Sequence, residues 1–149
     1  GVSGAGYNTH ELKEALEKIL GKDKIWNVVV LGVGHLGSAL LSYPGFKDHG
    51  LNIVAAFDSD PRKVGKQINE IPIFPVSALK KESKTRKVSI GIISTSAKNA
   101  QEVAEILVDA GITCILNFAP VALNVPEHVK IKDVDLSREL ESLSYYAAR

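Results

Sequence analysis

The chain has 149 residues, of which 45% are hydrophobic, and its formal net charge is +1. This length suits one domain with a well-filled core, and the near-neutral charge does not favour binding to nucleic acid or to a membrane surface. No apolar run approaches the roughly 18 residues of a transmembrane helix, and the N-terminus lacks a signal-peptide pattern. Cys114 is the single cysteine and lies in an apolar run, so we expect a buried thiol, a cytoplasmic protein and no intrachain disulfide.

A glycine-rich stretch and an amphipathic helix open the chain. Residues 1–6 are glycine-rich and have the composition of a linker, and Asn8 with Glu11 three residues later predicts a helix N-terminus. Apolar residues then recur at helical spacing at Leu12, Ala15, Leu16, Ile19 and Leu20. The chain contains no methionine and begins at Gly1, so we expect it to be a fragment of a longer protein.

Next comes a short apolar strand at residues 27–31 that ends in a G-x-G-x-x-G motif. Gly32 allows a tight turn, Gly34 lets a pyrophosphate approach the backbone, and Gly37 lets the following helix pack closely on the strand. The start of that helix carries unpaired N–H groups and a partial positive charge, which suit a phosphate. The expected binding residues are Gly32, Val33, Gly34, His35, Leu36 and Gly37.

A second apolar strand, at residues 51–57, ends in Asp58. This position lies about 20 residues past the last glycine, where a dinucleotide fold places the carboxylate that binds the adenosine ribose. The same carboxylate would repel a 2′-phosphate, so we expect NAD(H) rather than NADP(H). The alternative is that Asp58 only caps a turn and the glycines only serve packing. Asp60 before Pro61 predicts the cap of a further helix.

Strands and helices continue to alternate along the chain. We expect strands at residues 71–74, 87–93, 112–116 and 129–134, with helices at 76–81 and 98–110. This alternation predicts an α/β fold with a Rossmann-like, doubly wound parallel sheet, whose ligands lie beyond the carboxyl ends of the strands. Four loops should therefore line one crevice, and the last two contribute Ser94, Thr95, Ser96, Asn117, Phe118, Ala119 and Pro120.

The C-terminal segment predicts an amphipathic helix. Its apolar positions are Leu136, Leu140, Leu143 and Ala147, with Tyr145 and Tyr146 nearby. Such a helix could pack on its own sheet or on a second copy of the chain. Periodicity alone does not separate these two arrangements.

Five short motifs are spread in order along nearly the whole chain. They are Gly4-Ala5-Gly6-Tyr7-Asn8, Gly32-Val33-Gly34-His35-Leu36-Gly37, Phe57-Asp58-Ser59-Asp60-Pro61, Asn117-Phe118-Ala119-Pro120 and Val134-Asp135-Leu136. In this combination the chain resembles the redox-sensing transcriptional repressors of the Rex family. The combination is far more specific than any one motif.

The resemblance implies a homodimer that senses the ratio of NADH to NAD⁺. Residues 1–8 would be the linker from a missing N-terminal winged-helix domain, 9–134 the dinucleotide-binding domain, and 135–149 a dimerisation helix that is domain-swapped between subunits. Operator DNA would be bound only through the missing domain, and NADH would release it. In this family a linker tyrosine and the aspartate of the last motif form a switch contact, here Tyr7 and Asp135.

For three of these residues, a role without any part in ligand binding or switching remains an open alternative. Tyr7 could be an apolar residue at a helix entry, and Asp135 could cap a helix, although capping and switching are compatible. His35 stands where the family usually has asparagine, and it could contact phosphate or simply face solvent.

Two other classes of protein share this fold. An NAD-dependent dehydrogenase fragment needs a proton donor or acceptor beside the nicotinamide, and the crevice loops offer no His–Asp pair. A CoA-binding domain is the other alternative, against which Asp58 and the terminal helix argue. The sequence contains no cluster of Cys and His residues that would suggest a metal site. We therefore expect a sensor and not an enzyme, with an apolar pocket at residues 118–120 that disfavours the oxidised, cationic nicotinamide.

Overall fold

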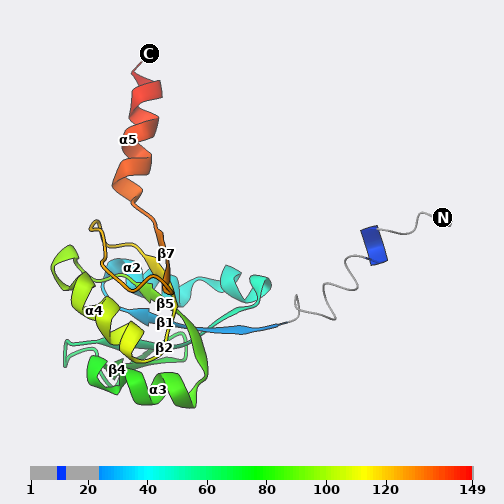
Figure 1. The fold of residues 1–149 in the computed structure, drawn as a ribbon, viewed down its shortest axis with the longest axis vertical. Helices are drawn as coiled ribbons and strands as arrows, with labels where there is room; N and C mark the ends of the chain where they lie inside the picture. The colour runs from blue at the N-terminus through cyan, green and yellow to red at the C-terminus, as the bar shows by residue number, and fades with distance from the viewer. Residues whose placement is uncertain (1–9, 13–23, 149) are drawn as a thin grey trace.

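The computed structural model describes residues 10–12 and 24–148, and in this part of the chain the strands form one seven-stranded sheet (Figure 1). The strand order is β3-β4-β2-β1-β5-β6-β7, and all neighbours pair in parallel except β3 with β4. The strands are β1 Trp26–Leu31, β2 Leu51–Asp58, β3 Gln67–Ile68, β4 Ile71–Pro75, β5 Val88–Ile93, β6 Cys114–Asn117 and β7 Lys130–Asp133. The predicted Rossmann-like sheet is confirmed.

Helices cover both faces of this sheet. Those after residue 24 are α2 His35–Ser42, η3 Pro44–His49, η4 Val76–Ala78, α3 Leu79–Thr85, α4 Ala97–Asp109 and α5 Leu136–Ala147. Side chains of α3 and α4 share one apolar core with Val29 and Leu31, whereas α2 shares a second core with Val28 and Val30. Successive β1 residues thus face opposite layers, which explains why a strand at the centre of the sheet has no polar alternation.

The helix predicted from Asn8 lies mostly outside the described residues. Residues 10–12 are helical, but the apolar stripe from Ala15 to Leu20 is not described. The linker assigned to residues 1–8 lies outside the described residues as well.

Cys114 is exposed, so the prediction of a buried thiol is wrong. Side chains alternate along β6, and Ile115 enters the core under α4 while Cys114 and Leu116 face the opposite side. On that side, the main helix contacts are those of α2 with β1 and β3 and of η3 with β2. An apolar strand therefore keeps an exposed position because its face lacks a covering helix in the described part of the chain.

No helix begins directly after Asp60, so the prediction that Asp60 caps a helix is wrong. Residues 61–65 form a turn, in which a carboxylate oxygen of Asp60 accepts a hydrogen bond from Arg62 N at 2.9 Å. The Arg62 side chain also hydrogen-bonds this carboxylate and so lowers the pKa of Asp60 below its usual value. The turn leads into the β3–β4 hairpin, which the sequence pattern did not reveal because β3 has only two residues.

The last helix projects away from the rest of the molecule (Figure 1). Asp135 caps it by accepting a hydrogen bond from Arg138 N at 3.1 Å, which is the structural alternative that the sequence left open for this residue. None of its residues is buried, and Leu140 and Leu143 are 67% and 63% exposed. No helix in the described ranges is long and apolar enough to cross a membrane.

Candidate functional site

A cleft of about 370 Å³ opens at the carboxyl ends of β1, β2 and β5. Seven of the predicted site residues line it, namely Gly32, Val33, Gly34, Asp58, Ser94, Thr95 and Ser96. The other lining residues were not among the expected binding residues, namely Leu31, Phe57, Ser59, Lys63, Val76, Asn99, Glu102, Val103 and Ile106. Four segments of the chain, at residues 31–34, 57–63, 76 and 94–106, therefore meet at one site.

The three glycines of the motif have three different surroundings. Gly32 has φ +100°, a left-handed conformation that side chains rarely tolerate. A Cβ on Gly37 would lie only 1.9 Å from the carbonyl oxygen of Gly32, so helix α2 packs directly on the end of β1. A Cβ on Gly34, by contrast, would meet no heavy atom within 4 Å. Gly32 and Gly37 shape the loop, whereas Gly34 leaves room for a ligand.

The N-terminus of α2 is open toward this space. Gly34 is its N-cap residue, and no side chain caps the helix. Its first N–H groups are therefore available to an anion, and the helix dipole favours one there. His35 is exposed and Leu36 is half-buried, and neither lines the cleft. Whether His35 contacts a phosphate stays a prediction.

Asp58 joins the end of β2 to the glycine loop. One carboxylate oxygen accepts a hydrogen bond from Val33 N at 2.8 Å, and the other accepts one from Asp60 N at 2.8 Å. The turn-forming alternative is thus part of what Asp58 does. Each oxygen retains a further lone pair, so the fixed carboxylate can still accept hydroxyl donors from the cleft. Lys63 closes the same corner, because its ammonium donates to the carbonyl oxygen of Val33 at 2.6 Å.

The loop after β5 forms the opposite wall. Ser94 donates from its hydroxyl to the carbonyl oxygen of Gly32 at 2.8 Å, and so ties this loop to the glycine turn. Ser96 is the N-cap residue of α4 and makes no side-chain capping bond. Beyond it, one face of α4 continues along the cleft.

The loop after β6 does not reach this cleft. Asn117 ends β6 and Phe118 to Pro120 follow it at the same edge of the sheet. However, Phe118 packs against the α2-side core and Ala119 against the α4-side core. Ala119 and Pro120 instead line a separate cavity of about 270 Å³, together with Asp133 and Asp135. The expectation that four loops line one crevice is therefore correct for three of them only.

Asn117 organises that loop from inside. Its side chain is 0% exposed, donates to the carbonyl oxygens of Ala119 and Val121 and to a carboxylate oxygen of Asp133, and accepts from Ala119 N. An amide can both donate and accept, which no apolar residue of similar size could do here.

We expect Asn117→Ala to lower the free energy of unfolding by about 3 kcal/mol, because buried donors and acceptors would lose their partners. Urea unfolding measures this loss. Asn124→Ala is the control and should change stability by less than about 0.5 kcal/mol, since that side chain is exposed and makes no hydrogen bond within the described residues. Equal stability of the two variants would show that the Asn117 bonds do not hold the loop.

Of the expected switch pair, Tyr7 and Asp135, the structure describes only Asp135. Tyr7 lies outside the described residues. Asp135 lies where the 270 Å³ cavity meets the start of α5, so its position is compatible with capping and with a switch. Within the ranges that the structure describes, no group of three or more His, Cys, Asp or Glu residues is arranged to hold a metal ion.

Residues 23–121 match the protein family described as CoA binding domain. Over 99% of its length the chain is 45% identical to the redox-sensing transcriptional repressor Rex of Desulforamulus reducens, and it covers 70% of that protein. It is 48% identical over its whole length to Rex of Carboxydothermus hydrogenoformans, of which it covers 72%.

Solved structures give the same relationship. RSP, a Rex-family repressor, is 39% identical to the chain, with a TM-score of 0.85 for its complex with NAD⁺ and operator DNA and 0.82 for its complex with NADH. The chain covers 68% of RSP in both complexes. An NAD(H)-bound scyllo-inositol dehydrogenase from Lactobacillus casei has a TM-score of 0.58 at 15% identity, with 84% of the chain and 42% of the enzyme covered, which indicates the fold alone. The chain therefore belongs to the CoA-binding domain family and to the Rex family of redox-sensing transcriptional repressors.

Proposed function

We propose that this chain is the NADH-sensing domain of a Rex-type transcriptional repressor and not an enzyme. The observation that carries the proposal is the cleft itself. An open helix N-terminus at Gly34 and a fixed carboxylate at Asp58 lie at one site, in a chain 39% identical to a repressor solved with NAD⁺ and with NADH. Because such a repressor must reach operator DNA, we place the protein in the cytoplasm.

The cleft suits the adenosine half of NAD(H). The N–H groups at the start of α2 would bind the pyrophosphate, and Asp58 would accept the ribose hydroxyls. The nicotinamide would then extend toward Phe118, Ala119 and Pro120. We propose that the ring packs on these apolar side chains and not beside the carboxylates of Asp133 and Asp135, which line the same cavity. The oxidised ring is then disfavoured, because burying an unpaired charge is costly.

The signal would leave the site through α5. Asp135 starts this helix at the edge of the cavity lined by Ala119 and Pro120. A ligand shifts a conformational equilibrium only by the difference in its affinity for the two states. We propose that reduced nicotinamide favours one position of α5, with the partner subunit's Tyr7-bearing linker completing the switch contact. In a longer chain, a winged-helix domain before residue 1 would carry this change to operator DNA.

A homodimer accounts for the exposed apolar stripe on α5. Leu136, Leu140 and Leu143 lie on one side of the helix and are at least half exposed. A monomer would leave this stripe in water, whereas a second copy can bury it by exchanging the same helix. We propose that residues 135–149 form this domain-swapped interface.

The family description makes CoA the second candidate ligand. CoA and NAD(H) both contain an adenosine diphosphate group, but CoA carries an additional 3′-phosphate on its ribose. The Asp58 carboxylate would face this phosphate and repel it. We therefore favour NAD(H).

Titration with NADH, NAD⁺ and CoA tests the proposal, with the mass measured by light scattering in the same samples. We expect a dimer that binds NADH about tenfold more tightly than NAD⁺, a difference of about 1.4 kcal/mol. CoA should not compete with NADH. A monomer, or equal affinity for NADH and NAD⁺, would overturn the sensor, and displacement of NADH by CoA would favour the alternative ligand.

We expect Leu140→Asp to raise the dimer dissociation constant by about 100-fold, because it replaces an apolar side chain that the proposed dimer would bury with a charge. The domain should stay folded, since no α5 residue is buried within its own chain. Ser142→Asp adds the same charge on another side of the helix and is the control. Light scattering across a dilution series measures both, and equal dissociation constants would place the interface elsewhere.

A further inference from the structure

The cleft extends from the glycine loop along one face of α4. Asn99, Glu102, Val103 and Ile106 occupy positions i, i+3, i+4 and i+7, so they lie on the same side of the helix, and all four line the cleft. Val76 of η4 lines the same cleft. This end of the cleft is therefore an apolar surface with two polar side chains on its border.

The order of groups in a nucleotide places the base at this end. A phosphate at Gly34 and a ribose at Asp58 leave the α4 end of the cleft for the purine ring. Val76, Val103 and Ile106 offer a flat heterocycle the apolar contact that such pockets usually provide. The polar edge of the ring would then meet Asn99 and Glu102.

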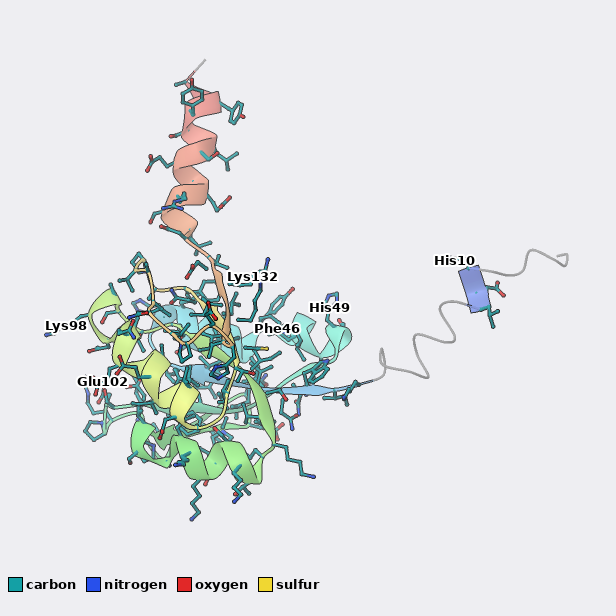
Figure 2. The ribbon with its side chains drawn as sticks, in the orientation of Figure 1. His10, Phe46, His49, Lys98, Glu102 and Lys132 are labelled. Carbon is teal, nitrogen blue, oxygen red and sulfur yellow. The ribbon has the colours of Figure 1, made fainter. Side chains whose placement is uncertain are left out.

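Glu102 is the uncommitted charge in the cleft. Its side chain is exposed on α4 (Figure 2). Within the described part of the chain, its carboxylate has no hydrogen-bond or ion-pair partner. Asp58 is held by two backbone N–H groups, and Lys63 is held by the Val33 carbonyl oxygen. Asn99 donates to the Ser96 hydroxyl at 3.3 Å and keeps its carbonyl oxygen free.

We propose that Glu102 recognises the 6-amino group of adenine and makes the site selective for 6-aminopurine over 6-oxopurine dinucleotides, an inference that rests on the proposed NAD(H) site. A carboxylate only accepts hydrogen bonds, and the 6-amino group only donates them. In hypoxanthine an oxygen replaces this amine, so two acceptors would face each other. Hypoxanthine has an N1–H donor, but N1 is the ring atom next to the carbon that carries the 6-oxygen. A carboxylate placed to accept from a 6-amino group would therefore not be aligned with this N–H.

The test compares NADH with reduced nicotinamide hypoxanthine dinucleotide, which differs only at this position of the base. We expect the chain to bind NADH about fivefold more tightly, a modest factor because Glu102 is solvated at the border of the cleft. Glu102→Gln should reduce this ratio to about one, since an amide can also donate to the 6-oxygen. Glu105→Gln is the matched control, because Glu105 lies on α4 outside the cleft and is bonded to Gln101.

The outcomes separate this inference from the proposed function. If NADH binds and the base ratio falls in Glu102→Gln but not in Glu105→Gln, Glu102 recognises the base. If NADH binds and the ratio is about one in the wild type, or unchanged in Glu102→Gln, the assignment of Glu102 is wrong while the NADH site stands. If the wild type does not bind NADH at all, the proposed function fails and the assignment fails with it.

Discussion

Gly37→Ala is expected to lower the free energy of unfolding by about 3 kcal/mol and to abolish NADH binding. A Cβ at this position would lie 1.9 Å from the carbonyl oxygen of Gly32, and a backbone atom cannot move aside as a flexible side chain can. Helix α2 must therefore shift away from β1. Overpacking of this kind typically lowers the free energy of unfolding by about 1–3 kcal/mol, and sometimes by more. Urea unfolding measures the stability, and fluorescence titration measures NADH binding.

Gly34→Ala is the matched control, because it adds the same methyl group in the same loop. No heavy atom lies within 4 Å of its Cβ position, and the residue has an extended backbone that alanine can adopt. Its stability should stay within about 0.5 kcal/mol of the wild type. NADH binding should still weaken, by about 100-fold, because the methyl group occupies the space through which a pyrophosphate approaches. A Gly34→Ala protein with unchanged NADH affinity would show that the phosphate lies elsewhere.

Asp58→Asn is expected to weaken NADH binding by about 30-fold. The ribose would lose charge-assisted hydrogen bonds, which are worth about 1.5–3 kcal/mol each. In the wild type, both oxygens of the Asp58 carboxylate accept hydrogen bonds from backbone N–H groups. The asparagine side chain would turn its NH₂ group toward one of these donors, so one hydrogen bond is lost and the glycine loop is held less firmly. Competition titration with NADH and NADPH measures both affinities.

The same variant should reduce the preference for NADH over NADPH by about 100-fold. Like unit charges 4 Å apart cost about 4 kcal/mol at an effective dielectric constant of 20, and solvent at this half-buried site lowers that cost. Asp60→Asn is the control, because its carboxylate lies two residues away, is bonded to Arg62 and does not line the cleft. An unchanged preference in Asp58→Asn would mean that another group excludes the 2′-phosphate.

The local parts of the site could be predicted because they depend on few neighbours. The strand at β1 is apolar on both sides, and Gly32 adopts a positive φ that its place in the turn requires. Asp58 follows the next strand at the spacing of a βαβ unit. The cap of α5 at Asp135 is equally local, since its hydrogen bond spans three residues.

Two predictions, the burial of Cys114 and the helix cap at Asp60, were wrong because each depends on which helices and strands pack beside the residue. Cys114 has an apolar neighbourhood in sequence, but the helices on its side of the sheet cover β1 and β2 instead. Asp60 before Pro61 fits a helix cap, but the chain has to turn there to form the β3–β4 hairpin.

By itself, the sequence determined the Rossmann-like fold, the glycine-rich turn after the first strand and the carboxylate at the end of the second, because periodicity, positive φ and strand-to-glycine spacing are properties of short segments. The tertiary structure alone decided that Lys63 and Glu102 border the cleft, and that Ala119 and Pro120 line a separate cavity. Those residues carry no local pattern of their own. Their roles arise because parallel strands bring the ends of distant segments to one edge of the sheet, where packing on either face directs each side chain.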